Sequence, residues 1–530
     1  MKTQDNKSFN ILYNTKYSKW IFVLLLIGIS FFYNFHKILF FHPQSVHQWR
    51  QCDCLSYTKN YYEEGMRFLQ PTLHCQLSDG GQSGNTVGEF PILYYLVAFL
   101  WKIFGQQEFI FRSVNLLIAF LGLFALFKVL EDLFKDSFWA VGISLLFYTS
   151  PMFVYYANNF LTNVPAFSIA IIGWYFFYQF YKNSKNSWLY LSLLFFLLGG
   201  LLKITSAMSF VVLFTVFFIE LLNIYKFKGK TKIFEQPYKQ IISFCIVIIC
   251  LISWYTYARY YNEKHQINLF LTGIWAIWQV DAEHIRQTWE NVRVLWVNAY
   301  FSKAVLFLAG ILFILIVILH RKIKRFFHTA TLLIFIGSIM YILLWFYAIR
   351  NHDYYFINLL ILIVFIFVSF FYYMKTSHYK LFKSLFLKLT FLFFLGYNIQ
   401  YCSNQIFDRY WGGWNNNWGI SDKYNKQDFE NITPYLRELS IERTDKVISI
   451  PDLSCNISLY LMDQKGWTSF GNDNTDSIKI AEKIQLGAKY LIISDSILYE
   501  QSYLKPFIKQ KIGCYKNIDI YDLSEFLKTH

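Results

Sequence analysis

Residues 90–104 read FPILYYLVAFLWKIF, a short apolar run that opens beside Pro91. A helix that crosses the hydrocarbon core of a bilayer needs about 20 mostly apolar residues, so this run is marginal. Each crossing reverses the side of the membrane on which every later loop lies. Whether this one segment crosses therefore decides the topology of the whole chain.

The composition indicates that lipid surrounds most of the chain. Of 530 residues, 55% are hydrophobic and 16% are charged, whereas soluble proteins carry about 25% charged residues. A formal net charge of +15 would favour a nucleic-acid partner in a soluble protein. Here the lysines cluster between apolar segments, a pattern that membrane orientation explains, so no nucleic-acid partner is expected.

About eleven other runs are long enough, or nearly so, to cross a membrane. The first, residues 20–41, is too long for the apolar part of a cleaved signal peptide and is expected to remain in the protein. The others lie at 113–134, 138–157, 164–181, 188–202, 206–225, 241–260, 303–320, 329–348, 356–374 and 384–400.

Basic connectors between these runs indicate which side is cytoplasmic. Residues 226–239, 321–325 and 375–388 are rich in lysine and arginine, and such loops stay in the cytoplasm. All three lie there, together with the N-terminus, only if residues 90–104 do not cross. We therefore interpret that segment as a juxtamembrane or re-entrant helix on the outer face. If it crossed, every later loop would change sides.

The tail is less hydrophobic and alternates helix and strand patterns. Residues 411–419, WGGWNNNWG, are interpreted as an interfacial linker because Trp favours the headgroup region. The alternation beyond it favours a small α/β domain with a mostly parallel sheet. No glycine-rich phosphate-binding motif follows a strand, so no nucleotide cofactor is expected. Strands are predicted at 445–452, 488–495 and 514–521, and helices at 427–440, 458–464 and 476–486.

The predicted organisation follows from these two regions. The chain is expected to be a polytopic α-helical membrane protein with a transmembrane domain at 1–400, which includes a first outer loop at 42–112. A soluble α/β domain outside the cytoplasm is expected at 401–530. The expected location is the cytoplasmic membrane of a bacterium.

The first outer loop holds the strongest catalytic candidate, Asp53. It lies in HPQSVHQWRQCDCLSYTKNYYEEG, residues 42–65, shortly after the first span. A carboxylate just above the bilayer can accept a proton from an attacking hydroxyl. The structural alternative is that Asp53 caps a helix that runs to Tyr62.

Other chemically suggestive residues are predicted on the same outer side. Lys203 lies at the boundary between two spans, where an ionisable side chain is costly and is a candidate to bind a phosphate. The alternative is a lysine that extends to lipid headgroups. Arg350 is a second phosphate candidate because a guanidinium binds two phosphate oxygens at once. The same turn contains His352, Asp353, Tyr354 and Tyr355.

The residues that follow Asp53 resemble a known family. Within GEFPILYYLVAFLWKIFGQQEFIFRSVN, residues 88–115, the chain has Pro91, Tyr94, Tyr95, Gly105, Glu108 and Arg112. This order resembles the C-type glycosyltransferases (GT-C) of the protein O-mannosyltransferase and lipid A aminoarabinose transferase group. Their segment commonly reads K-P-P-L-Y-Y or H-P-P-L, and here Phe90 replaces the first proline. The resemblance covers about 1–400 in architecture and, in motifs, only 45–205 and 345–360.

The resemblance implies a GT-C fold and an inverting hexosyl or pentosyl transfer. The donor would be a sugar linked to a polyprenyl phosphate, and the acceptor a glycan, lipid or protein hydroxyl. Asp53 would be the catalytic base, and Lys203, Arg350 and His352 would bind the donor phosphate. The residues expected to bind substrate are Glu89, Tyr94, Arg112, Asn158, Asn159, Asn163, Asp353, Tyr354 and Tyr355.

Several of these residues have a simpler structural reading. Glu89 and Arg112 are also consistent with a surface acid and an interfacial arginine. The three asparagines also suit a helix junction, where amides satisfy loose backbone groups. Tyr354 and Tyr355 also fit an interfacial aromatic belt.

Metal and disulfide assignments stay open. Asn163 stands where the family often has an acid that assists a metal; an amide is a weaker ligand, so a divalent cation is possible but no metal ligand is assigned. His42, His47 and His74 lack a recognised zinc spacing. Cys75 could pair with Cys52 or Cys54 in the outer loop, where oxidation is possible, and the sequence decides neither the pairing nor the disulfide state.

Two other classes of protein are alternatives to a glycosyltransferase. A transporter or flippase predicts internal repeats and charged residues along a pathway, and neither is evident. A polysaccharide polymerase or ligase shares the lipid-linked donor but typically has its large catalytic loop late in the bundle. Here the acid lies in an early loop.

Overall fold

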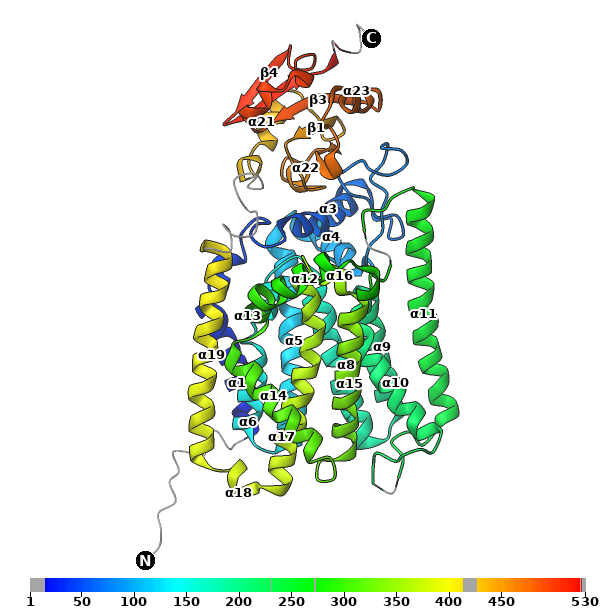
Figure 1. Cartoon of the computed structure of the whole chain (residues 1–530), viewed down its shortest axis with the longest axis vertical. Helices are drawn as coiled ribbons and strands as arrows, with labels where there is room; N and C mark the ends of the chain where they lie inside the picture. The colour runs from blue at the N-terminus through cyan, green and yellow to red at the C-terminus, as the bar shows by residue number, and fades with distance from the viewer. Residues whose placement is uncertain (1–14, 230, 271–272, 413–426, 525, 527–530) are drawn as a thin grey trace, which may run out of the picture. The chain divides into compact units, whose positions relative to one another are not determined.

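The computed structural model describes residues 15–229, 231–270, 273–412, 427–524 and 526, and contacts divide the chain into two compact units (Figure 1). The first unit comprises Met1–Leu39, Arg112–Trp254 and Gly273–Phe407. The second comprises Phe40–Phe111, Tyr255–Thr272 and Asp408–His530. The boundary predicted at 400/401 stays a prediction, but the contacts group the tail with the first loop. Most of the predicted linker at 411–419 lies outside the described residues.

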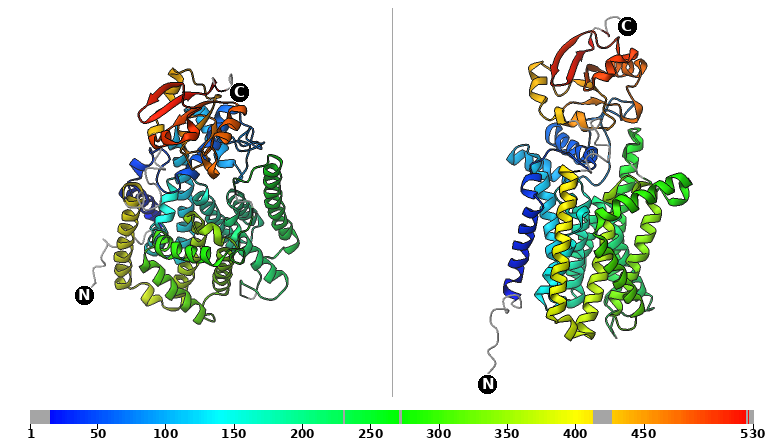
Figure 2. Two further views of the ribbon diagram at one scale, coloured as in Figure 1. Left: turned by 45° about the horizontal axis from the view of Figure 1, so that its top comes forward. Right: turned by 60° about the vertical axis from the view of Figure 1, so that its left-hand side comes forward.

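The first unit is helical, and its long helices run side by side (Figures 1 and 2). One end of each of three of the helices named next, those at Glu108–Phe134, Pro237–Lys264 and Leu385–Trp411, belongs to the second unit. The helices are α1 (Thr15–Phe32), α2 (Phe35–Ile38), α5 (Glu108–Phe134), α6 (Ser137–Phe147), α7 (Pro151–Ala157), α8 (Asn163–Asn183), α9 (Asn186–Leu202), α10 (Met208–Leu221), α11 (Pro237–Lys264), α12 (Ala282–Asn291), α13 (Val297–Tyr300), α14 (Lys303–Ile318), α15 (Arg325–Leu344), α16 (Phe346–Ile349), α17 (Leu360–Ser377), α18 (Tyr379–Phe382) and α19 (Leu385–Trp411). Short 3-10 segments at Ile204–Ala207 and Asp353–Leu359 lead into α10 and α17.

Six helices in the described residues are long and apolar enough to cross a membrane, and two bent pairs, α6 with α7 and α12–α13 with α14, raise that number to eight. The chain is therefore a polytopic helical membrane protein, as predicted. The predicted number of about eleven spans stays a prediction, since α1 and α9 are shorter apolar helices.

Buried acids fold two of the basic connectors against the helix ends. Glu220, fully buried in α10, accepts the backbone N–H groups of Phe227 at 2.9 Å, Ile233 at 2.7 Å and Phe234 at 3.0 Å. Asp136 caps α6 and accepts Lys388 at 2.8 Å. Both acids satisfy donors that lipid could not, and Asp136 also neutralises the charge of a lysine.

Residues 90–104, on which the predicted topology depends, form helix α4 (Ile92–Phe104), which belongs to the second unit. Its 13 residues extend about 20 Å, less than the hydrocarbon thickness of about 30 Å. The prediction that this segment does not cross is retained on that ground.

The tail forms a five-stranded sheet in the order β2-β1-β3-β5-β4. β1 is parallel to β2 and β3, whereas β5 is antiparallel to β3 and β4. The sheet is therefore mixed, and the prediction of a mostly parallel sheet is wrong. The elements are α21 (Thr433–Glu438), β1 (Lys446–Ile450), α22 (Ile457–Leu461), β2 (Gly466–Trp467), α23 (Ser477–Gln485), β3 (Ala488–Ile493), β4 (Lys511–Tyr515) and β5 (Ile518–Asp522).

Two local predictions in the tail are also wrong. The strand predicted at 514–521 is a hairpin, because Lys516 adopts a left-handed conformation with φ of 53° and reverses the chain. The helix predicted at 427–440 is reduced to a 3-10 turn at Gln427–Phe429 and to α21.

The first loop packs against this sheet. Gln76 donates its backbone N–H to the carbonyl of Gly466 at 2.8 Å, and Gly466 donates to His74 at 3.2 Å. A Cβ at Gly466, where φ is 157°, would lie 1.8 Å from the carbonyl oxygen of Val447, so only glycine fits. Cys75 and Cys455 form a disulfide, and Cys52 and Cys54 are buried free thiols. Both predicted pairings of Cys75 are therefore wrong.

The disulfide gives a direct test of this packing. After thiol alkylation and proteolysis without reductant, we expect one linked pair of peptides containing Cys75 and Cys455, which separates on reduction. The Cys455→Ser variant should leave Cys75 alkylated, and Cys514, which is exposed and free, serves as the internal control. Mass-spectrometric detection of a link from Cys75 to the peptide of Cys52 and Cys54 would contradict the structure.

Candidate active site

Asp53 lies inside helix α3 (Gln48–Glu64), in the second unit. The residue that caps this helix is His47, so the alternative of Asp53 as a helix cap is wrong. The side chain is 3% exposed, and a buried carboxylate is costly unless partners compensate its charge. The partners of Asp53 therefore define the site.

One partner is Arg50, which precedes Asp53 by one turn of α3. Its Nη2 donates to both oxygens of Glu89, at 2.8 and 2.6 Å, and its Nη1 lies 3.5 Å from Oδ2 of Asp53. The guanidinium also covers the ring of Phe270, 4.7 Å from its centroid. A single buried cation thus serves two buried carboxylates.

The other partner comes from the tail. Nδ2 of Asn456 donates to Oδ1 of Asp53 at 2.8 Å, while its Oδ1 accepts the backbone N–H of Cys75 at 2.9 Å. Asn456 is fully buried and follows Cys455, so the disulfide to Cys75 fixes the segment that carries it. This segment follows the carboxyl end of β1, the strand between β2 and β3. Such reversals of strand order are the usual place for functional loops in open α/β sheets.

Burial and these partners set the protonation of Asp53. Burial raises its pKa above the ordinary value, while the Arg50 charge and the hydrogen bond from Asn456 partly oppose that rise. Burial would lower the pKa of Arg50, but Glu89 and the other acidic neighbours, Asp53 among them, together outweigh burial, and the pKa is raised. Arg50 therefore stays charged, and Asp53 becomes a stronger base than an exposed carboxylate.

Glu89 and Tyr94, both predicted substrate residues, belong to the same cluster. The Tyr94 hydroxyl donates to Glu89 at 3.2 Å and lies 3.5 Å from the Cys54 sulfur. Its ring stacks on Tyr57 with centroids 5.3 Å apart. Burial raises the pKa of Cys54 to about 11, so this thiol is neutral. Glu89 is 9% exposed and ion-paired, not a surface acid.

The histidines of the first loop have structural partners. His74 shares a 2.7 Å hydrogen bond with Ser56, and burial lowers its pKa to about 4, so the ring is neutral. His42 pairs with Glu108 at 2.9 Å. No group of three or more His, Cys, Asp and Glu side chains in the described part of the chain is arranged to bind a metal.

A second group of predicted residues lies in the first unit, around the start of α8. Arg112 is fully buried, donates to the carbonyl of Asn158 at 2.5 Å and covers the Phe160 ring at 4.1 Å. It is therefore not an interfacial arginine. Asn163 donates to the carbonyl of Tyr354 at 3.3 Å. The Asn158 amide is fully buried and makes no hydrogen bond among the described residues.

The turn before α17 joins this group. Asp353 is fully buried and accepts the hydroxyl of Tyr156. The Lys203 ammonium group faces the rings of Tyr354 and Tyr355, at 5.8 and 5.7 Å from their centroids. The rings of Tyr354 and Tyr355 therefore pack around a cation.

Two further residues of that turn have partners on other elements. The His352 ring lies 5.3 Å from that of Tyr354, and its Nδ1 is 3.1 Å from the carbonyl of Ala348. Arg350 extends toward α12, where its Nη1 donates to Gln287 at 3.3 Å. The guanidinium of Arg350 is thus hydrogen-bonded to α12.

Sequence reasoning missed Arg50 and Asn456. Arg50 had a detectable signal, since it stands three residues before Asp53 on one predicted helix and such spacing places both on the same face. Asn456 had none, because 403 residues separate it from Asp53.

Comparisons with known proteins show which proteins this chain resembles in sequence and in fold. Residues 89–257 match the sequence profile of the dolichyl-phosphate-mannose-protein mannosyltransferase family. A search of curated proteins found no match.

Three solved structures illustrate the likeness in fold. ArnT from Cupriavidus metallidurans bound to undecaprenyl phosphate is similar with a TM-score of 0.57 and 9% identity, over 95% of this chain and 98% of that chain. The Archaeoglobus fulgidus oligosaccharyltransferase AglB with an inhibitory peptide and a dolichol-phosphate is similar with a TM-score of 0.52 and 14% identity, over 91% and 70%. The mycobacterial arabinofuranosyltransferase AftD has a TM-score of 0.57 and 10% identity, over 95% and 41%.

These structural similarities, at low identity, establish the fold, and it is that of the GT-C glycosyltransferases. The region matched in sequence, residues 89–257, includes Glu89, Tyr94 and Arg112. The chain thus resembles the GT-C membrane glycosyltransferases in its fold, as the motif resemblance predicted. Within that class, the region matched in sequence is that of the mannosyltransferase family.

The Arg50–Glu89 pair should stabilise the second unit measurably. Glu89→Gln leaves Arg50 with only its longer contact to Asp53, and Arg50→Met leaves two buried carboxylates without their cation. Each is expected to lower stability by about 3–5 kcal/mol. The Arg50→Met, Glu89→Gln double variant should lose less than the sum of the two single losses. Thermal unfolding of the purified protein in detergent measures all three.

An exposed ion pair provides the control for this cycle. Arg259 and Glu263 are 73% and 63% exposed, and removing both should change the unfolding temperature little. Strictly additive losses at Arg50 and Glu89 would contradict a direct interaction.

Proposed function

We propose that this enzyme transfers a sugar from a polyprenyl-phosphate-linked donor to an acceptor hydroxyl on the outer face of the bacterial cytoplasmic membrane. Asp53 is the general base. The observation that carries the proposal is the buried carboxylate of Asp53, held by a cation on one oxygen and by an amide on the other.

Asp53 accepts the proton of the acceptor hydroxyl as that oxygen bonds to the anomeric carbon. The bond from that carbon to the phosphate oxygen breaks in the same displacement, and the electron pair leaves with the phosphate. Asn456 fixes the orientation of the carboxylate, and Arg50 limits the rise of its pKa. Glu89 occupies two donors of Arg50, which reduces the electrostatic effect of that cation on Asp53.

A single displacement inverts the anomeric configuration. Retaining transfer needs a second carboxylate as a nucleophile, about 5–5.5 Å from the acid in the glycosidases that use this mechanism. The nearest candidate in the cluster is Glu89, and both of its oxygens accept from Arg50. The arrangement therefore favours one base and an inverting reaction.

The leaving phosphate requires cations, and the first unit offers Lys203. Tyr354 and Tyr355 orient its ammonium group, and His352 adds a ring nitrogen beside them. Positive charge fixed in advance stabilises the negative charge that develops on the departing oxygen. Arg350 is a second candidate ligand of this phosphate, and its hydrogen bond to Gln287 must break before it can bind there.

The buried amide of Asn158 supports a polar ligand near this cluster. Unpaired buried polar groups are rare and costly, and sugar hydroxyls would satisfy both the donor and the acceptor atoms. Asn159 and Asn163 would contribute to the same sugar-binding surface. The acceptor is a glycan, a lipid or a protein hydroxyl, and a divalent cation is not required by these residues.

Mass spectrometry of glycans and lipids from a deletion strain tests the proposal. The deletion should remove one hexose or pentose from an envelope glycan, lipid or protein, and should accumulate its polyprenyl-linked donor. Unchanged glycosylation together with blocked export of a lipid-linked glycan would instead support a flippase.

Substitution of Asp53 tests the base. Asp53→Asn should lower transfer by about 10²–10⁴-fold, without loss of membrane insertion. In the wild type, transfer should fall as the pH falls through the raised pKa of Asp53, because only the deprotonated form accepts a proton.

A second aspartate in the same loop is the matched control for that variant. Asp79 pairs with His265 at 2.7 Å outside the cluster, and Asp79→Asn should retain transfer. Wild-type activity in Asp53→Asn would end the proposal of Asp53 as the base.

Asn456 is a positioning residue, and its substitution has a distinct signature. Removing its N–H favours the protonated carboxyl, so Asn456→Ala should move the acid limb of the pH profile to higher pH. The value of kcat should fall about tenfold, which is the effect of one hydrogen bond to a charged group, with little change in KM.

Asn517→Ala, at an exposed amide of the same domain, is the control and should leave the profile unchanged. A loss of folded protein without a shift of the limb would indicate a purely structural role for Asn456.

A further inference from the structure

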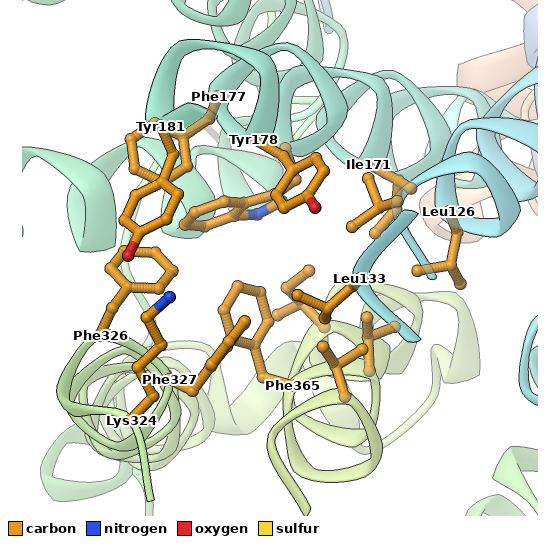
Figure 3. Close-up of a pocket in the computed structure, with 15 residues that line it drawn as sticks. Leu126, Leu133, Ile171, Phe177, Tyr178, Tyr181, Lys324, Phe326, Phe327 and Phe365 are labelled. Carbon is orange, nitrogen blue, oxygen red and sulfur yellow. The ribbon is translucent and has the colours of Figure 1, made fainter. Parts of the chain in front are cut away.

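We propose that the first unit contains a binding site for an anionic phospholipid of the surrounding bilayer, separate from the residues assigned to catalysis. The site is an apolar pocket between α5, α8, α15 and α17, with Lys324 at its edge (Figure 3). All of its lining residues belong to the first unit.

The lining of this pocket favours a hydrocarbon chain as the part of the ligand that lies inside it. Leu133, Ile171, Trp174, Phe327 and Phe365 are among the side chains that face it, and it contains about 710 Å³ of empty space, including its open side. Sugars and phosphates would lose their hydrogen bonds to water there without replacement. A hydrocarbon chain loses none.

A second, smaller apolar space adjoins the pocket. It contains about 310 Å³, including its open side, shares Leu126, Ile171 and Val364 with the first and is also lined by Gly122 and Phe153. From Gly122 to Leu133 the helix α5 rises about 16 Å. An elongated apolar groove of this kind fits an extended acyl chain better than a compact molecule.

Lys324 defines the charge of the ligand's head. Its side chain extends to the edge of the pocket beside Tyr181 and Phe326 (Figure 3), and its Nζ lies 4.9 Å from the centroid of the Tyr181 ring and 5.5 Å from that of Tyr372. No carboxylate among the described residues pairs with this ammonium group. Two aromatic rings hold the cation in place and leave its charge available to an anion.

The surroundings of Lys324 reinforce the positive potential. The Nζ of Lys228 also lies 5.7 Å from the centroid of the Tyr181 ring, and Arg325 follows Lys324 at the start of α15. The N-terminus of a 20-residue helix adds partial positive charge at the same point. The nearby acid Asp132 is already shared by Lys135 and Lys182. Basic pockets between spanning helices bind anionic headgroups.

The position along the helices separates this site from the donor phosphate. The pocket touches Val368 in α17 and Lys324 before α15, whereas the Lys203 cluster includes the turn before α17 and packs against Tyr341 near the end of α15. The two cations therefore stand at opposite ends of these helices. A bilayer phospholipid is the occupant that carries both an anionic head and acyl chains at that end.

The test compares lipids on the purified full-length protein. Delipidated protein in detergent is titrated with phosphatidylglycerol or phosphatidylcholine of the same acyl chains, and native mass spectrometry measures bound lipid. The wild type should prefer phosphatidylglycerol. Lys324→Ala should reduce that preference about fivefold, the effect of one basic residue near an anionic lipid.

Lys322→Ala, an exposed lysine of the same connector, is the matched control and should retain the preference. Lys324→Arg should also retain it, which keeps the test decisive if Lys324→Ala does not fold. Ile171→Trp, which fills the pocket, should weaken the binding of both lipids.

Three outcomes would overturn the proposal. Equal affinity for the two phospholipids in the wild type would show that the site does not select an anionic headgroup. An unchanged preference in Lys324→Ala would show that Lys324 does not bind the headgroup. Displacement of phosphatidylglycerol by undecaprenyl phosphate at equimolar concentration, abolished in Ile171→Trp, would assign the pocket to a polyprenyl carrier instead.

Discussion

The guanidinium of Arg50, enclosed with the carboxylates of Glu89 and Asp53, is the constraint on which the second unit depends. Three ionised groups leave water together, and a buried set of this kind survives only when each charge has a partner in good geometry. The contacts at 2.6 and 2.8 Å satisfy Glu89, while the 3.5 Å approach leaves Asp53 less compensated. The difference gives Glu89 a structural role and makes Asp53 the carboxylate that we propose as the base.

The same constraint arranges the chain around it. The start of α4 must approach α3 so that Glu89 reaches Arg50, and stacking of Tyr57 on Tyr94 fills the space beside the ion pair. Asn456 then completes the coordination of Asp53 from the other side. Buried charge, aromatic packing and a hydrogen bond from the tail thus act on one short helix. Hydrophobic burial alone would not specify such an orientation.

Much of this organisation could be predicted from local sequence. The apolar runs identify a polytopic helical protein, the β1 and β3 patterns are correctly placed, and the position of Asp53 after the first apolar run marks it as a candidate. Long-range contacts could not be predicted. Cys75 and Cys455 are 380 residues apart, and no periodic pattern connects them. Pairing of Cys75 within the loop was therefore the simpler hypothesis. The hairpin at Lys516 was missed because it lacks the glycine that usually marks such a turn.

The apparent surface residues show a second limit. Glu89 and Arg112 look like ordinary polar residues near a membrane in a linear reading, since burial depends on neighbours brought by other segments. In the structure both are enclosed, Glu89 by Arg50 and Arg112 by the carbonyl of Asn158 and the Phe160 ring. The same limit applies to Asn158, before α8. Its amide suggests a ligand only once the structure shows that the amide is buried and makes no hydrogen bond among the described residues.

The link between Cys75 and Cys455 has a consequence for biosynthesis. A ribosome makes the chain from its N-terminus, so the helix that carries Asp53 is complete long before the strand that precedes Asn456 has been translated. During that interval the carboxylate lacks its amide partner and the loop lacks its covalent tie. Completion of this cluster therefore awaits delivery of the last part of the polypeptide to the same compartment, and a chain whose synthesis stops after the final spanning helix would lack both the amide and the disulfide.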